Sequence, residues 1–115
     1  MPTPEGRALT SAETELIRWL LINGEAGAER FLAGVESLRV VASCKCGCAS
    51  VDFTANMDGE MAVVSDFGAV GPDGMPGGVF LFTRGGRLAG LEVWSPGAPI
   101  TELPAPASLR PLPSK

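Results

Sequence analysis

The spacing of the hydrophobic residues changes at Arg39, and this change limits the folds that the chain can adopt. Before Arg39, apolar residues recur every three or four positions, which is typical of helices with one buried face. After Arg39 they tend to alternate with other residues, which is typical of strands in a sheet. A helical segment followed by a run of strands predicts an α+β fold.

Two helices are predicted over residues 11–38. Thr10 and Glu13 have the spacing of a capping box, in which each side chain accepts a hydrogen bond from the backbone N–H of the other residue, so the first helix is expected at residues 11–23. The second helix is indicated by apolar residues that would share one face: Ala28, Phe31, Leu32, Val35 and Leu38. The short link between the helices predicts an antiparallel helical hairpin, and residues 1–9 are expected to form a loose arm.

A four-stranded antiparallel sheet is predicted over residues 39–95. Its strands are expected at residues 39–55, 60–69, 78–84 and 87–95. Asp58-Gly59 and Gly85-Gly86 can adopt the positive φ angles of two-residue hairpin turns, so the strands should follow one another as a β-meander with the helices packed on one face. The Asp58-Gly59 hairpin would pair Phe53 with Val64.

The Gly85-Gly86 turn also predicts which side chains face the helices. It would place Arg84 opposite Arg87 and, further along, Phe82 opposite Ala89. The face toward the helices would then carry Phe80, Phe82, Ala89, Leu91 and Val93. The opposite face would carry four apolar residues, Val79, Leu81, Leu88 and Trp94. Because so apolar a face is unusual when it is left to water, we predict that these four residues contact a partner.

Proline recurs through residues 96–115. The positions are Pro96, Pro99, Pro104, Pro106, Pro111 and Pro113. Proline lacks the backbone N–H that helices and central strands need, so this segment is expected to lie against the body as an extended strap. A chain of 115 residues has room for one modest core, which predicts a single domain over residues 1–115.

The charge and the missing residue types argue against several classes of function. The formal net charge is −4 and the basic residues are scattered, which argues against nucleic-acid binding. The chain has no histidine, so Ser-His-Asp and Cys-His catalysis within one chain and His-ligated metal sites are excluded. We therefore predict that the protein is not an enzyme.

The N-terminal residues lack the positive and apolar regions of a signal peptide. The most apolar run, residues 16–22, contains an arginine and is too short to cross a bilayer. These features predict a cytoplasmic protein that does not bind membranes, in which the cysteines stay reduced.

The three cysteines fall in one short segment, as Cys44, Cys46 and Cys48. The preferred interpretation is structural, because free cysteine is among the most buried residue types. The alternatives are a zinc site or a reactive thiol. In a regular strand, residues four apart are separated by about 13 Å, so Cys44 and Cys48 could reach one zinc only if the strand broke at Gly47. Asp52 or Asp66 would then have to supply the fourth ligand. No cofactor is expected under the preferred interpretation.

Three carboxylates, Asp52, Asp66 and Glu92, fall inside predicted strands, where acidic residues are uncommon. The preferred interpretation is that they are solvated or edge residues, which discourage one sheet from pairing with another. The alternative is that two of them face inward and act as a general acid and base.

Two phrases of the sequence resemble a family of small bacterial proteins with no established activity. They are R-V-V-x-x-C-x-C-G-C-x-S-V-D-F at residues 39–53 and L-x-x-L-E-V-W-S at residues 88–95. The resemblance covers roughly residues 12–110 and implies no catalytic residue. In size and layout alone, the chain also resembles the immunity proteins that neutralise bacterial toxins.

These observations lead to three hypotheses about function. The first is a non-enzymatic protein-binding module of the immunity-protein or inhibitor type. The second is a metal-binding or redox module based on the cysteines. The third is a structural homodimer that forms through the apolar sheet face. The expected partner is therefore another protein or a second copy of this chain.

Overall fold

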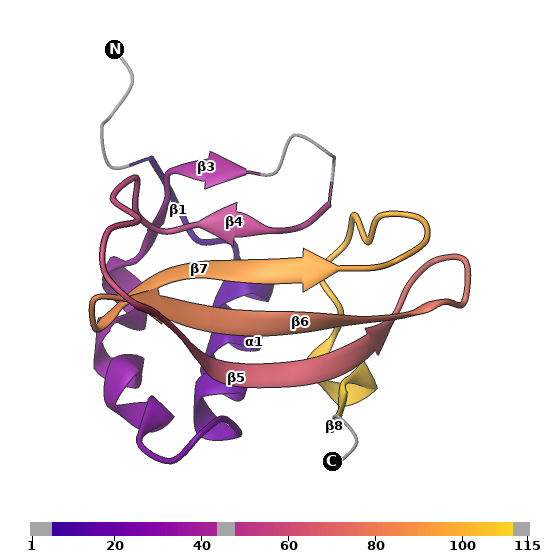
Figure 1. The fold of residues 1–115 in the computed structure, drawn as a ribbon, viewed down its shortest axis with the longest axis horizontal. Coiled ribbons are helices and arrows are strands. Elements are labelled where there is room, and N and C mark those ends of the chain that lie inside the picture. The colour runs from indigo at the N-terminus through magenta and orange to yellow at the C-terminus, as the bar shows by residue number, and fades with distance from the viewer. Residues whose placement is uncertain (1–5, 44–47, 112–115) are drawn as a thin grey trace.

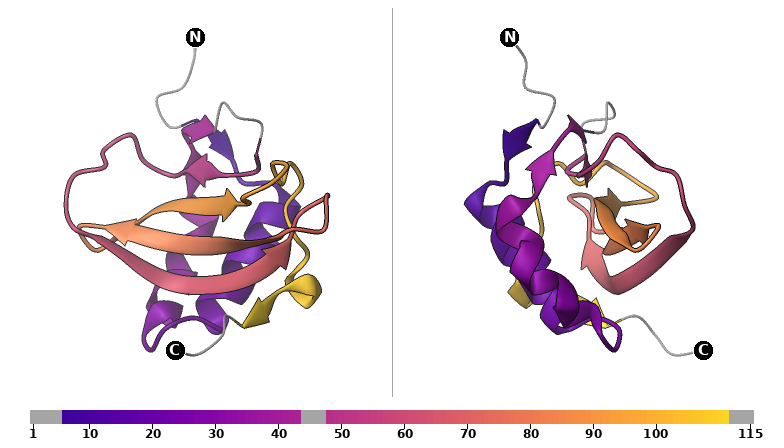
Figure 2. Two further views of the ribbon diagram at one scale, coloured as in Figure 1. Left: turned by 45° about the vertical axis from the view of Figure 1, so that its right-hand side comes forward. Right: turned by 90° about the vertical axis from the view of Figure 1, so that its left-hand side faces the viewer.

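A computed structural model describes residues 6–43 and 48–111 of the chain. The architecture is α+β, as predicted: two helices lie behind an antiparallel sheet, and the two form separate layers (Figures 1 and 2). The main sheet has six strands in the order β3-β4-β7-β6-β5-β8, and a second sheet pairs β1 with β2. Among the described residues, no helix is both long and apolar enough to cross a membrane.

Helix α1, Ser11–Ile22, begins at the predicted capping box. The Thr10 hydroxyl accepts from the Glu13 backbone N–H at 3.1 Å, and the Glu13 carboxylate accepts from the Thr10 N–H at 2.8 Å. The buried apolar side chains of the helix are Leu16, Ile17, Leu20 and Leu21. After the helix, the chain passes so close to the sheet that a Cβ on Gly24 would lie 2.3 Å from the Val64 carbonyl oxygen. Glycine is therefore required where the helix meets the sheet.

The second helix, η1 (Ala28–Ser37), is a 3₁₀-helix, although the spacing of its apolar residues predicted an ordinary α-helix. Its apolar residues also form rows three positions apart, 28/31 and 32/35/38, and a helix with three residues per turn aligns such rows. Gly34, in its interior, further weakens the preference for an α-helix. Ala28 and Val35 are buried in the core, where η1 contacts α1, and Phe31 and Leu32 pack against the same core.

The N-terminal segment is more ordered than the predicted loose arm. Strand β1, Arg7–Ala8, pairs with β2, Arg39–Val40. Arg7 also forms an ion pair with Glu13 at the start of α1. The prediction of a loose arm is therefore wrong for Arg7 and Ala8, because backbone pairing with β2 holds both residues and the buried Glu13 carboxylate binds Arg7. Residues 1–5 lie outside the described chain.

The predicted first strand at residues 39–55 does not exist as one strand. It is divided into β2, β3 (Ala42–Ser43) and β4 (Val51–Asp52), and residues 44–47 lie outside the described chain. Strand β4 pairs with β7, so Val51 lies opposite Leu91 and the predicted pairing of Phe53 with Val64 is wrong. The predicted four-stranded meander is therefore wrong in its first strand.

The segment between β4 and β5 explains this difference. Its polar side chains bond to the nearby backbone: the Asn56 N–H donates to Thr54 Oγ1 at 3.1 Å, and the Asp58 N–H donates to Asn56 Oδ1 at 2.9 Å. Such local hydrogen bonds compete with a strand ladder. Gly59 has a φ of +95°, but it packs against Gly85 at the tip of another hairpin. Asp58-Gly59 is therefore not a hairpin turn between paired strands.

Strands β5 (Met61–Val70), β6 (Pro76–Arg84) and β7 (Arg87–Trp94) do follow one another as neighbours (Figure 1). The Gly85-Gly86 turn is confirmed, with φ angles of +57° and +83°, and Arg84 lies opposite Arg87. The register then shifts by one residue, so that Phe82 lies opposite Gly90 and Leu81 lies opposite Leu91. A shift of one residue exchanges the two faces of a strand.

This shift reverses the predicted faces of β6. Val79 and Leu81 point into the core and have no exposed area. Leu91 and Val93 of β7 point the same way, and at most 1% of the surface of either is exposed. The prediction that Phe80 and Phe82 face the helices is therefore wrong. For β7 the prediction stands, because Ala89, Leu91 and Val93 are buried.

The proline-rich tail runs along one end of the layers and contains a short 3₁₀-helix, η2 (Pro106–Ser108), and strand β8 (Arg110–Pro111). Ile100 is buried, and Leu103 and Leu109 pack against the core. Strand β8 pairs with Phe67 and Gly68 at the edge of β5. The tail therefore lies against the body through its apolar residues, as expected.

Candidate functional site

The four residues predicted to contact a partner do not share one surface. Val79 and Leu81 have no exposed area, and Leu88 is half-buried against the core. Only Trp94, with 43% of its surface exposed, lies where a partner could reach it. The prediction is wrong for Val79 and Leu81 because the register shift after Phe82 turns both side chains inward.

An exposed apolar face nevertheless exists on the side of the sheet away from the helices. Side chains alternate between the two sides of a strand, so the register shows which of them point outward together. The outward side chains are those of Phe80 and Phe82 on β6, Glu92 and Trp94 on β7, and Met61, Val63 and Asp66 on β5. We call these seven residues the outer face. Met61 and Val63 are 39% and 40% exposed, so that they and Trp94 offer apolar surface to solvent on this side of the sheet.

Two glycines determine how the aromatic rings lie on the outer face. Gly78 is directly opposite Trp94, and a Cβ on Gly78 would be 2.6 Å from Trp94 Nε1. Gly90 is directly opposite Phe82, and a Cβ there would be 2.7 Å from the Phe82 ring. Each ring therefore lies across the backbone of a glycine in the neighbouring strand. Phe80 lies along β6 between the two rings, with its centroid 5.9 Å from that of Phe82.

Carboxylates flank the central aromatic residue of the outer face. Asp66 and Glu92 lie directly opposite Phe80 on its two neighbouring strands, so their backbones are about 10 Å apart. Burial raises the pKa of Asp66 above its ordinary value. Burial also raises the pKa of Glu92, the nearby charge of Asp52 adds to the rise, and the Ser50 hydroxyl opposes it. Neither carboxylate forms an ion pair with any described residue.

A hollow of about 360 Å³ adjoins Trp94 at the edge of β7. It is lined by Cys48, Glu92, Val93, Trp94, Ser95, Gly97, Pro99 and Ile100. Strand β4 ends before this point, and Ser50 takes the place of a paired strand: its hydroxyl accepts from the Val93 N–H at 2.8 Å and donates to the Val93 carbonyl at 3.0 Å. Ser50 therefore supports the segment of β7 that carries Glu92 and Trp94.

Replacing Ser50 with alanine should lower the free energy of unfolding by about 1 kcal/mol, because both backbone groups of Val93 lose their partner while water from the adjoining hollows can reach them. Urea unfolding of the variant measures the loss. Ser43→Ala, at an exposed position in β3, is the control and should change stability by less than about 0.5 kcal/mol. Equal values for the two variants would contradict the role of Ser50.

The cysteine site stays a prediction. Cys44 and Cys46 lie outside the described chain, and Cys48 is half-buried with its thiol 3.3 Å from Ser50 Oγ. Within the described part of the chain, no group of three histidine, cysteine, aspartate or glutamate residues could hold a metal ion. Asp52 and Asp66, the two predicted fourth ligands, lie on strands β4 and β5, which are separated by β7 and β6.

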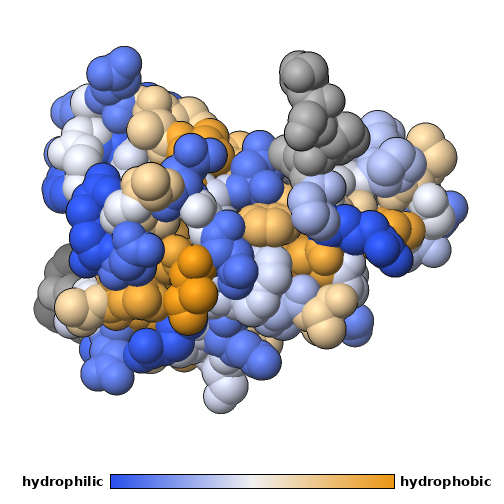
Figure 3. Space-filling view, turned by 90° about the horizontal axis from the view of Figure 1, so that it is seen from below, coloured by the Kyte–Doolittle hydropathy of each residue, from blue (hydrophilic) through white to orange (hydrophobic). Residues whose placement is uncertain are grey.

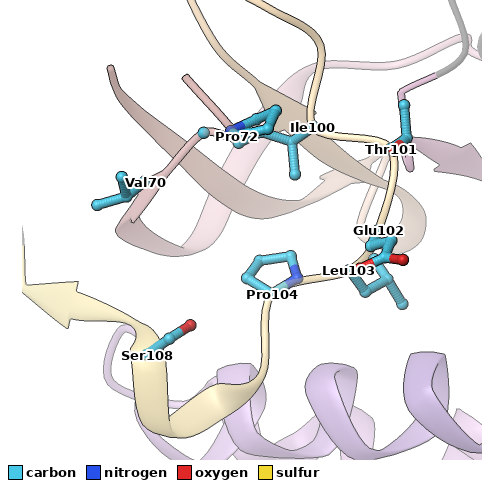
Figure 4. A pocket seen from close by; sticks show the side chains of 9 residues that line it. Val70, Pro72, Ile100, Thr101, Glu102, Leu103, Pro104 and Ser108 are labelled. Atoms are coloured by element: carbon cyan, nitrogen blue, oxygen red, sulfur yellow. The ribbon is translucent and has the colours of Figure 1, made fainter. Parts of the chain in front are cut away.

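Another hollow, of about 380 Å³, lies between the tail and the end of β5. Figure 4 shows its lining, which comes from Val70, Gly71 and Pro72 on one side and from Ile100–Pro104 and Ser108 on the other. Glu102 is the one ionisable residue in this lining, so the hollow lacks the paired groups of an acid–base site.

Apolar side chains also reach the surface outside the outer face, and these include Ile22, Val70 and Met75. Seen from below, the molecule carries hydrophobic residues in several separate patches among hydrophilic ones (Figure 3). The outer face differs from this side, because its apolar residues come from three neighbouring strands and have the carboxylates of Asp66 and Glu92 among them.

Sequence reasoning missed Phe80 and Phe82 as residues of the outer face, because it placed both on the side toward the helices. The useful signal was Gly90, since a glycine inside a strand often marks a bulge or the close approach of a neighbouring group. A bulge beside Gly90 would have turned Phe80 and Phe82 outward. Comparisons with family models, with curated proteins and with solved structures find no match to this chain.

Proposed function

We propose that the protein is a non-enzymatic protein-binding module of the immunity-protein or inhibitor type, and that it binds its partner through the outer face. The observation that carries this proposal is Trp94, which lies flat across Gly78 with 43% of its surface exposed. Exposed aromatic residues in an apolar patch are typical of the energetic centre of protein interfaces.

The surroundings of Trp94 support the same proposal. Met61, Val63 and Phe80 extend the apolar surface across β5 and β6, and Asp66 and Glu92 add polar groups to it. An apolar centre beside polar groups is the composition expected of an interface that forms between separately folded proteins. The rings need little reordering on binding, because the neighbouring strands already hold two of them flat.

Replacing Trp94 with serine should weaken binding of the native partner by at least about tenfold, because a central aromatic residue commonly contributes 2 kcal/mol or more. The partner is first captured from the native cell on immobilised wild-type protein, and its affinity for each variant is then measured with purified components. Ile22→Ser is the matched control, since Ile22 is an apolar residue that is 63% exposed at the end of α1 and is not part of the outer face.

The expected result is that wild type and Ile22→Ser bind the partner equally and Trp94→Ser does not. Thermal unfolding of both variants verifies that they fold. If a folded Trp94→Ser variant holds the partner as tightly as wild type, the outer face is not the binding surface.

A further inference from the structure

We infer that the outer face recognises a basic side chain of the partner protein, preferably an arginine, which lies against Phe80 and Trp94 between the carboxylates of Asp66 and Glu92. This inference rests on the proposed function, because it names the chemistry of the partner that the outer face would bind. It is carried by the positions of the acidic groups relative to the rings and by the distribution of charge over the sheet.

The row Asp66–Phe80–Glu92 has the dimensions of a site for one cation. The three residues lie directly opposite one another on β5, β6 and β7. Neighbouring strands are about 5 Å apart, so a cation above Phe80 would be offset by about 5 Å, measured across the sheet, from the strand that carries each carboxylate. Both carboxylates are acceptors, and a guanidinium group presents several N–H donors in one plane. One arginine can therefore donate to both sides while its plane rests on a ring.

The aromatic rings suit the same ligand. A guanidinium group is attracted to the face of an aromatic ring, and it stacks there better than an ammonium group does. The chain already contains one such contact, since the Arg30 guanidinium carbon lies 4.4 Å from the centroid of the Phe31 ring. Trp94 and Phe80 present rings of this kind beside Glu92, on a surface that solvent can reach.

No described cation of this chain forms an ion pair with the two carboxylates of the site. The described cations that the register places on the same side of the sheet are Arg84 and Arg87, at the hairpin tip, and Arg110 of β8, which lies opposite Gly68 and so beside the strand that carries Asp66. Arg84 is four positions from Phe80, about 13 Å along β6, and its Nη1 donates to the Gly59 carbonyl. Asp66 and Glu92 therefore carry negative charge into a partly desolvated surface without an ion-pair partner among the described residues, and a partner protein can supply one.

A second copy of the chain fits this surface poorly. A twofold dimer through the outer face would bring the same patch of each copy together, and with it the two rows of carboxylates. Like charges that face one another across an interface are unfavourable, and the net charge of −4 adds to the repulsion. The charge distribution thus favours a basic partner over self-association.

The test measures binding of two short peptides to the wild-type protein by nuclear magnetic resonance. One peptide carries a single arginine among glycines and serines, and the other carries citrulline at the same position, which keeps the shape and removes the charge. The arginine peptide should shift the backbone amide signals of Phe80, Glu92 and Trp94 during titration. The citrulline peptide should bind at least about tenfold more weakly, as expected for the loss of a charge-assisted contact.

Two double variants of equal charge separate a site from general attraction. Asp66→Asn with Glu92→Gln should weaken binding of the arginine peptide by at least about tenfold. Glu15→Gln with Glu29→Gln changes the net charge by the same two units at exposed positions of the helices, and it should change the affinity by less than about twofold. Circular dichroism and thermal unfolding verify that both variants fold.

The inference is overturned if the citrulline peptide binds as well as the arginine peptide, if both double variants lose affinity equally, or if the shifted signals lie away from the outer face. Concentration-dependent dimerisation of wild type that is lost in Trp94→Ser would also overturn it, in favour of a second copy. Binding of the native partner distinguishes failure of the arginine site from failure of the protein-binding function. A partner lost by Trp94→Ser but kept by Asp66→Asn with Glu92→Gln leaves the protein-binding function standing and removes the basic side chain; a partner kept by Trp94→Ser removes the function itself.

Discussion

Replacing Leu81 with alanine should lower the free energy of unfolding by about 3 kcal/mol, the middle of the range for removing a fully buried leucine side chain. Leu81 has no exposed area, and its neighbours in the core include Val79 and Leu91. The cost has two parts, the lost burial of the removed carbons and the cavity that the packed core cannot close. Urea unfolding at neutral pH, followed by circular dichroism, measures the change.

Val63→Ala is the control for Leu81→Ala. Val63 is 40% exposed on the other side of the same sheet, so its truncation should cost less than about 1 kcal/mol. The comparison tests the register shift after Phe82, since an unshifted ladder would turn Leu81 toward solvent. Similar losses in the two variants would contradict the assignment of the two faces.

Replacing Glu13 with glutamine should lower the free energy of unfolding by about 2 kcal/mol at neutral pH, because the side chain loses charge-assisted hydrogen bonds inside the fold. Glu13 is 5% exposed. Its two carboxylate oxygens accept from Arg7 Nη1 and Nη2, each at 2.9 Å, and Oε1 also accepts from the Thr10 N–H at 2.8 Å. One residue thus joins strand β1 to the first turn of α1.

The stability contributed by Glu13 should depend on pH with a defined sign. Hydrogen bonds from Arg7 are the main cause that holds the pKa of Glu13 below its ordinary value of 4.5; burial opposes them, and the Thr10 N–H adds to them. A carboxyl group whose pKa is lower in the folded state stabilises the protein above the unfolded pKa, and this contribution disappears as the pH falls through the folded pKa. The difference between wild type and Glu13→Gln should therefore shrink below pH 4.5.

Unfolding curves at several pH values from neutral to acidic measure this difference. Glu29→Gln, at an exposed position of η1, is the matched control and should change stability by less than about 0.5 kcal/mol at any of these pH values. A Glu13→Gln deficit that stays constant as the pH falls would contradict the proposed ion pair.

The parts of the fold that the sequence predicted correctly depend on neighbouring residues. The capping box at Thr10 and Glu13 and the turn at Gly85-Gly86 need a few residues in one local conformation, and both form where they were predicted. The buried residues of α1 follow from its periodicity for the same reason. Local chemistry of this kind carries its own signal, so no knowledge of distant contacts is needed.

The candidate site was predicted only in part, because a sheet register depends on every residue between the turn and the site. The pairing of Arg84 with Arg87 at the Gly85-Gly86 turn was predicted correctly. Ala89 is an extra residue in β7 that shifts the register after this pair, so Phe80 and Phe82 point outward where Leu81 was expected to do so. Trp94 was assigned to the exposed face correctly, because β7 lies beyond the shift. Val79 and Leu81 were not, because they lie on the strand that the shift inverts.

Local patterns in the chain were enough to predict that helices precede strands, that α1 starts at Ser11 and that the last hairpin turns at Gly85-Gly86. The pairing of β4 with β7, and the surface that Phe80 and Trp94 share with Asp66 and Glu92, appear only when the strands are assembled. Capping hydrogen bonds and helical periodicity act within a few residues, whereas strand partners and bulges are selected by how the whole core packs beneath them.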